Sequence, residues 1–151
     1  MQRTTLKSVK REGITAILIN KGKILTLKRR NFPFITNPGI WFFVTGGLKK
    51  NESYVSAVYR ELEEETGIKR THLRLIDSFD VQLFDKAKSW RWHNKCFIFY
   101  TNSRKIRLNI ENSKFTWISL NDIISEKSFS NIFINKMNII NKIQGALSGN
   151  K

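Results

Sequence analysis

The chain is poor in cysteine and has no long apolar run, and these two absences exclude several classes of protein. Cys96 is the only cysteine in 151 residues, so no internal disulfide can form. It lies in the apolar run Cys96–Tyr100, which predicts a buried structural thiol and not a nucleophile. No apolar stretch approaches the ~20 residues of a membrane helix, and the polar, basic residues 1–11 do not resemble a secretory signal. We therefore expect a cytoplasmic protein without a membrane partner.

Acidic residues are also scarce. Asp and Glu number 12 against 27 Lys and Arg, which gives a net charge of +15. One interpretation is attraction to polyphosphate or nucleic acid. The other is a general bias of the composition towards lysine, isoleucine and asparagine, since the lysines are spread along the whole chain. The sequence leaves both interpretations open.

The few acids are concentrated in one place. Like charges at i,i+3 and i,i+4 on a helix repel each other by roughly a few tenths of a kcal/mol per pair, so folding alone does not explain such a cluster. Divalent cations such as Mg²⁺ or Mn²⁺ suit hard oxygen ligands and are the natural partners. Of the 12 acids, 5 lie within 14 residues: Glu52, Glu61, Glu63, Glu64 and Glu65.

The length of 151 residues predicts one domain over residues 1–151. Its order of strands, helix, strands and helix predicts an α/β (α+β) fold, in which a mixed β-sheet carries helices on both faces. A C-terminal helix within Phe129–Leu147 would bury one stripe: Phe129, Phe133, Met137, Ile140 and Ile143. The predicted strands are Gly13–Ile19 and Ile24–Lys28, joined by a tight turn, then Trp41–Val44, Leu73–Phe84, Trp92–Tyr100 and Phe115–Ile118. The prolines mark an irregular loop over Asn31–Gly39.

A central helix is predicted over Glu52–Thr66. Val55, Val58 and Leu62 recur at i, i+3 and i+7 and define its core face. Gly67 is a natural C-cap.

The glutamates of this helix occupy a second stripe. Glu61, Glu64 and Glu65 stand at i, i+3 and i+4, offset from the core face by roughly a quarter to a third of a turn. Carboxylates in that position would line a groove at the edge of the core. Just upstream, the Gly46-Gly47 pair predicts a break in the chain where the backbone can approach a metal or phosphate closely.

These residues form a recognisable motif. Gly46 is followed after five residues by Glu52, and after seven more by Arg60-Glu61-Leu62-Glu63-Glu64-Glu65-Thr66-Gly67-Ile68. Every specified position matches the Nudix box G-x5-E-x7-R-E-U-x-E-E-x-G-U, where U is a bulky aliphatic residue. The chain therefore resembles the Nudix hydrolase family, with the box at residues 46–68. The two strands before the box and the segment Phe115–Asp122 resemble the flanking parts of that domain.

The resemblance implies a Nudix-type α/β/α sandwich and a metal-dependent hydrolase. Glu64 and Glu65 would be the main ligands of Mg²⁺ or Mn²⁺. Glu61 would be a further ligand, or would act on metal-bound water. The Gly46 carbonyl would be a backbone ligand. Such ions neutralise a diphosphate, generate a nucleophilic water and stabilise the leaving phosphate.

Other residues would support the chemistry. The resemblance implies that Arg60 pairs with a box glutamate and fixes its orientation. Glu52 would act on the metal site indirectly, by contact with a ligand or through a water molecule. Glu111, outside the box, is a candidate general base, although a role as a surface loop residue is an equal alternative. Thr45 stands where many family members have proline before the paired glycines, which affects the loop but removes no ligand.

The substrate side is less specified by the sequence. Arg29, Arg30 and Lys49 could bind phosphates, and Trp92 could stack on a nucleobase. The alternatives are solvated charges for the cations and core packing for the tryptophan.

We expect a nucleoside triphosphate pyrophosphohydrolase that releases a nucleoside monophosphate and pyrophosphate, because features of other Nudix subfamilies are missing. Two alternatives stay open. One is a pyrophosphohydrolase acting on the 5′ end of RNA, which the charge of +15 favours. The other is a non-catalytic nucleotide-binding Nudix module. The expected partner is thus a nucleotide or RNA, and the chain would work as a monomer or homodimer.

Overall fold

A computed structural model describes residues 9–31, 39–85, 90–126 and 136–149. The elements follow in the order β1 (Val9–Asn20), β2 (Lys23–Arg29), β3 (Trp41–Phe42), β4 (Val44–Gly47), α1 (Tyr54–Thr66), the short 3₁₀ helix η1 (Arg70–His72), β5 (Leu73–Asp85), β6 (Trp90–Thr101), β7 (Asn112–Ile118), α2 (Leu120–Ser125) and α4 (Lys136–Gly149).

The strands form one mixed, seven-stranded sheet. Its order is β3-β2-β1-β6-β5, with β4 also paired to β1 and β7 to β2. β1 and β6 run parallel along nearly their whole length, whereas the other pairings are antiparallel. β1 is therefore the strand around which the sheet is organised.

The predicted hairpin of β1 and β2 is confirmed, with a longer first strand. Its two turn residues, Lys21 and Gly22, have φ values of 48° and 76°. Positive φ at both central positions is the geometry of a two-residue turn whose twist matches that of the strands.

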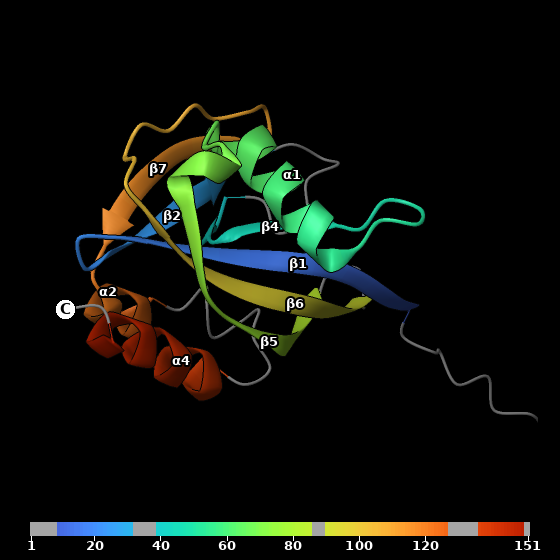
Figure 1. Cartoon of the computed structure of the whole chain (residues 1–151). Coiled ribbons are helices and arrows are strands. Elements are labelled where there is room, and N and C mark those ends of the chain that lie inside the picture. Colours follow the sequence, from blue (N-terminus) through green and yellow to red (C-terminus); the bar gives the residue numbers. More distant parts are fainter. Residues whose placement is uncertain (1–8, 32–38, 86–89, 127–135, 150–151) are drawn as a thin grey trace, which may run out of the picture.

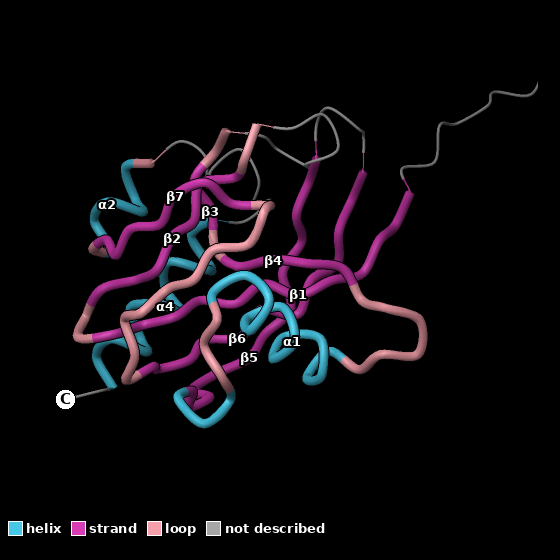
Figure 2. Tube along the Cα trace, turned by 90° about the horizontal axis from the view of Figure 1, so that it is seen from above, coloured by secondary structure: helices cyan, strands magenta, loops and turns pink. Residues whose placement is uncertain are grey.

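Helices cover both faces of the sheet, which confirms the predicted layers. Figure 1 shows α1 on one side and α2 with α4 on the other. Two separate cores result, because neighbouring strand residues point to opposite faces. Leu18 and Phe99 pack in the core that contains Leu62 of α1. The preceding residues of the same strands pack in the other core with α2 and α4. Seen from above in Figure 2, α1 lies across β1 and β4.

Local capping signals set the ends of α1. The Ser53 side chain accepts a hydrogen bond from the Ser56 backbone N–H at 3.1 Å, and Gly67 takes a left-handed conformation with φ 74°. The helix thus begins two residues later than predicted, because Ser53 and not Glu52 satisfies its first N–H groups.

Several expectations about local structure are wrong. Gly46 and Gly47 do not break the chain but lie within β4, where they pair with Ile14 and Gly13 of β1. The predicted strand Trp41–Val44 is divided between β3 and β4.

Two residues expected in a core are exposed. Val55 is 48% exposed and Met137 is 61% exposed, because each lies in the first turn of its helix and burial begins further along. The proline loop, together with Phe129 and Phe133, lies outside the described residues. No helix within the described ranges is long and apolar enough to cross a bilayer.

We predict that Gly67→Ala destabilises the protein by roughly 1–2 kcal/mol, because a Cβ is disfavoured in the left-handed region and would press on the Arg107 side chain at 3.2 Å. Gly145→Ala is the matched control, since Gly145 lies in α4 with nothing within 4 Å of a Cβ. It should stabilise by up to about 1 kcal/mol. Urea denaturation measures both; equal effects of the two substitutions would contradict the assigned conformations.

Candidate active site

The loop between β4 and α1 brings Glu52 back towards the helix. Its Oε1 accepts a hydrogen bond from the Lys49 backbone N–H at 3.0 Å. The turn also contains Asn51 with φ 60°, a conformation that asparagine tolerates better than most residues. Glu52 is thereby held beside the side chain of Arg60.

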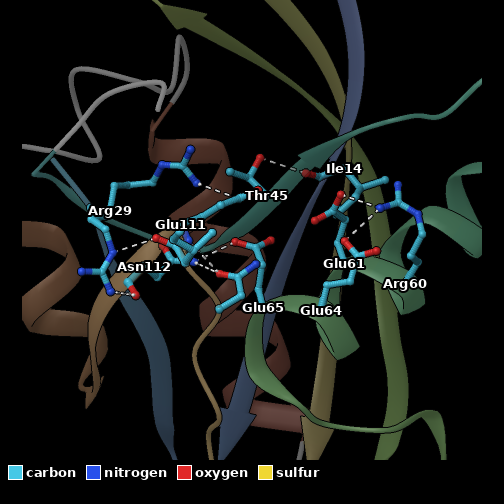
Figure 3. A network of polar contacts seen from close by, with 12 residues as sticks. Ile14, Arg29, Thr45, Arg60, Glu61, Glu64, Glu65, Glu111 and Asn112 are labelled. Atoms are coloured by element: carbon cyan, nitrogen blue, oxygen red, sulfur yellow. Dashed lines mark hydrogen bonds and ion pairs between the residues drawn. The ribbon is translucent and has the colours of Figure 1, made fainter. Parts of the chain in front are cut away.

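Arg60 connects the acidic side chains of the site (Figure 3). Its Nε and Nη2 donate to the two oxygens of Glu52 at 2.7 and 2.8 Å, a bidentate pair. Its Nη1 donates to Glu61 Oε1 at 2.8 Å and to Glu64 Oε2 at 3.2 Å, and Nη2 also reaches the Gly47 carbonyl at 3.1 Å. These bonds, with the Lys49 N–H, lower the pKa of Glu52 to about 2. They also raise the pKa of Arg60, chiefly through Glu52.

Glu61 lies against the backbone of β4. It is 8% exposed, and its carboxyl group occupies the space that a Cβ on Gly46 would fill. Burial raises the pKa of Glu61, while the hydrogen bond from Arg60 opposes that effect. Glycine at position 46 is therefore required by close packing of the carboxylate, not by a break in the strand.

Thr45 fixes the strand at this point. Its hydroxyl donates to the Ile14 carbonyl at 3.0 Å and accepts from Asn94 Nδ2 at 3.3 Å. Asn94 is buried and also donates to the Thr15 hydroxyl at 2.9 Å. The residue that stands in place of proline thus ties β4 to β1 and β6 directly beside Gly46.

Glu65 is the most deeply buried acid of the site, at 1% exposure. Its Oε1 accepts from Asn112 Nδ2 at 3.0 Å, whereas its buried Oε2 has no hydrogen-bond partner. Burial, followed by repulsion from Glu61, raises the pKa of Glu65 well above the usual value. A buried carboxylate with an unsatisfied oxygen is unfavourable, and a bound cation would remove that cost.

The prediction that the glutamates line the edge of the core is wrong in detail. Glu61 and Glu65 lie on the buried side of α1, together with Ala57 and Leu62. Of the three predicted ligands, only Glu64, with a side chain that is 49% exposed, faces outwards. The buried positions are tolerated because Arg60 and Asn112 donate to the carboxylates.

Asn112, which opens β7, was not predicted as a site residue. It is 1% exposed and supplies the hydrogen bond that orients Glu65. The preceding residue is the candidate base, but an asparagine outside the box, in a polar segment, carries no pattern of its own. Only the pairing of β7 with β2, which shifts register at Lys28 and Arg29, brings it under α1.

The structure brings Glu111 and Arg29 to the same end of the site. Arg29 Nη1 lies 3.8 Å from Glu111 Oε2, and the charges of both act on the pKa of Glu65. The Glu111 side chain is 41% exposed, whereas that of Arg29 is 9% exposed. Glu111 thus combines proximity to the buried carboxylates with access to solvent, and its role as a base stays a prediction.

Arg30 has a different environment from Arg29. Its Nε donates to the Ile110 carbonyl at 2.7 Å and its Nη2 to the Asn112 carbonyl at 3.4 Å. The guanidinium therefore holds the segment before β7 in place, and its use for phosphate binding stays a prediction.

Lys49 and Trp92 line one groove, of about 620 Å³, next to the glutamates. The rest of the lining consists of Arg11, Glu12, Gly47, Leu48, Lys50, Asn51 and Glu52. The Trp92 ring lies over Gly47, about 3.7 Å from the position of a Cβ there. Two residues predicted separately for substrate binding thus share one groove, which also carries two further cations and two carboxylates.

The residues present fit a divalent cation. Glu61 and Glu65 are neighbouring buried carboxylates of raised pKa, and Glu65 Oε2 lacks a partner. Carboxylate oxygens are hard ligands suited to Mg²⁺ or Mn²⁺. Within residues 9–31, 39–85, 90–126 and 136–149, no three acidic, His or Cys side chains already converge on one point. Arg60 Nη1 donates to both Glu61 and Glu64. Binding would therefore require Glu64 to turn from Arg60.

Comparison with known proteins places this geometry in context. The NUDIX domain family model matches residues 9–136. An RNA pyrophosphohydrolase of Pelagibacter ubique (strain HTCC1062) is 39% identical over 64 residues, or 42% of this chain and 38% of that protein. The matches span about a third to a half of the length of such curated relatives.

Two solved structures share the fold. The MutT protein from Methanosarcina mazei Go1 has a TM-score of 0.74 at 23% identity, covering 97% of this chain and 100% of its own. The dihydroneopterin triphosphate pyrophosphohydrolase of E. coli has a TM-score of 0.62 at 25% identity, covering 83% and 92%.

We predict that Glu65→Gln stabilises the metal-free protein. The amide can keep the bond from Asn112 and donate to Glu61, which removes a buried unsatisfied carboxylate worth roughly 1–3 kcal/mol. The unfolding temperature in a chelator should rise by about 2 °C or more. The gain should grow as pH rises through the raised pKa values of Glu61 and Glu65, because the folded wild type loses stability there.

Added Mn²⁺ should then raise the unfolding temperature of the wild type but not of Glu65→Gln. Glu63→Gln is the matched control, since that side chain is exposed; it should leave both responses unchanged. A Glu65→Gln protein that is less stable in chelator yet still responds to Mn²⁺ would refute the assignment of Glu65.

Proposed function

The chain belongs to the Nudix family, whose domain model matches residues 9–136, and on this premise we propose that it is a metal-dependent hydrolase that cleaves a diphosphate bond in a nucleotide-type substrate. The single observation that carries the proposal is the arrangement of the box acids. Arg60 joins Glu52, Glu61 and Glu64. Glu65 presents a buried oxygen that nothing else in the described chain satisfies.

A divalent ion held by Glu61, Glu64 and Glu65 would neutralise the phosphates and activate water for attack on phosphorus. The chain's own residues perform the remaining tasks. Arg60, anchored on Glu52, fixes the direction of the Glu61 carboxylate. Asn112 does the same for Glu65.

A proton must leave the attacking water. Glu111 is our candidate acceptor, because its carboxylate is partly exposed and lies near Glu65. One of its oxygens would take the proton, and Arg29 at 3.8 Å would hold the side chain in reach.

We propose a 5′-triphosphate as the substrate, with release of pyrophosphate and formation of a monophosphate. The names of two relatives support a pyrophosphohydrolase, since one is an RNA pyrophosphohydrolase and the other a dihydroneopterin triphosphate pyrophosphohydrolase. Lys49 in the groove would contact the phosphates and Trp92 would stack on the base. Free nucleoside triphosphates are our first candidates.

The 5′ end of RNA is the second candidate. The net charge of +15 favours it, and so do the several relatives named RNA pyrophosphohydrolase. A non-catalytic module is less well supported, because the chain retains every carboxylate of the box.

The test is a panel of nucleoside triphosphates, dinucleoside polyphosphates, nucleotide sugars and 5′-triphosphate RNA, each with Mg²⁺ or Mn²⁺. Pyrophosphate should appear from the triphosphates. Release of single phosphates, or turnover confined to nucleotide sugars, would contradict the proposed reaction.

We predict that Glu64→Gln lowers turnover by on the order of 10²-fold or more, without loss of stability, because its side chain is 49% exposed. Glu63→Gln, one residue earlier on the exposed side of the same helix, is the matched control and should retain turnover. Unchanged turnover in Glu64→Gln, or an equal loss in both variants, would remove Glu64 from the metal site.

A further inference from the structure

A basic surface lies at the C-terminal end of α1. It consists of five exposed residues, two after the helix and three in the segment before β7: Lys69, Arg70, Arg104, Lys105 and Arg107. The two segments are joined because the Arg107 N–H donates to the Thr66 carbonyl at 2.8 Å. His72 and Asn102 also lie within hydrogen-bond distance of each other, at 2.9 Å.

The charge of this surface is not balanced within the described chain. Neither 67–76 nor 101–110 contains an Asp or Glu. The ion pairs found among the described residues all involve other cations. The dipole of α1 places only about half a negative charge at the C-terminal end of the helix, which balances at most one of the five cations. The excess therefore suits an external polyanion.

Aromatic rings accompany the cations. The Arg70 guanidinium lies 4.2 Å from the centre of the Tyr59 ring, and that of Arg104 lies 5.4 Å from the Trp117 ring. Phe115 is 41% exposed and precedes Trp117 by two residues in β7, so both side chains project from the same face. The two rings that the cations contact are partly buried, whereas Phe115 is open to solvent. A surface that combines cations with an accessible ring can hold single-stranded nucleic acid through phosphate contacts and base stacking.

The surface is continuous with the active site along the chain. Figure 1 shows the segment between β6 and β7 passing the end of α1 before it enters β7. After Arg107 it reaches Glu111 and Asn112, which adjoin Glu65. A strand of nucleic acid on the basic surface would therefore lie beside the carboxylates.

We propose that the basic surface binds the single-stranded body of an RNA whose 5′ phosphates are presented to the glutamates. Cleavage of the bound RNA rests on the proposed function, whereas binding of the RNA to the basic surface does not. The partner is thus a flexible RNA chain, whereas a free nucleotide would engage only the glutamate site and the groove.

The experiment measures binding of a short, unstructured 5′-hydroxyl RNA by fluorescence anisotropy over a range of salt concentrations. This RNA carries no diphosphate, so binding is independent of cleavage. Arg104→Glu with Lys105→Glu should weaken binding at least tenfold. It should also reduce the slope of log affinity against log salt by about one unit or more. Turnover of a nucleoside triphosphate should be unchanged.

The matched control is Lys136→Glu with Lys142→Glu, which makes the same change in net charge on α4, across the sheet. It should retain RNA affinity; equal weakening in both variants would overturn the proposal, because net charge would then be the cause. Absence of RNA binding by the wild type would also overturn it.

Phe115→Ala separates nucleic acid from other polyanions. Loss of a base stack should weaken RNA binding about fivefold or more, while binding of inorganic polyphosphate should not change. Wild-type binding to anionic vesicles but not to RNA would overturn the choice of partner. If RNA binds as described while no triphosphate is hydrolysed, the proposed function fails and the assigned surface stands.

Discussion

One guanidinium, that of Arg60, holds together the loop and the helix that carry the acidic residues. Its bidentate pair with Glu52 ties the start of the box to its middle, and its third nitrogen is shared between Glu61 and Glu64. Without this cation, three carboxylates would repel each other within one helical turn and the adjacent loop. The Arg60 guanidinium makes no hydrogen bond to Glu65. The most deeply buried acid therefore depends on a different hydrogen-bond donor, Asn112.

The sheet makes room for this arrangement. Glu61 is accommodated only because Gly46 has no side chain, and Gly46 is held in register by the bonds that Thr45 makes to β1 and β6. β7 then brings Asn112 to Glu65 from the opposite side. Burial of the Glu61 and Glu65 carboxylates is unfavourable in itself, and hydrogen bonds from Arg60 and Asn112 offset part of that cost. One oxygen of Glu65 stays without a hydrogen-bond partner.

Much of this could be predicted from the sequence, because the signals are local. The hairpin turn at Lys21-Gly22, the Gly67 cap and the amphipathic helix are fixed by a few neighbouring residues, and the box spacing identified the acids. The inward direction of Glu61 and Glu65 could not be predicted, since it depends on partners far along the chain. Asn112 is 47 residues from Glu65, and the pairing of Gly46 depends on β1. Periodicity alone also placed Val55 and Met137 in cores that begin only after the first turn of each helix.

If these acids hold a divalent ion, anomalous diffraction from crystals grown with Mn²⁺ will locate it. We expect a peak beside Glu65 Oε2, shared with Glu61 or Glu64, with Arg60 still paired to Glu52. A well-ordered structure in saturating Mn²⁺ with no such peak, in which Glu64 remains bonded to Arg60, would contradict this expectation.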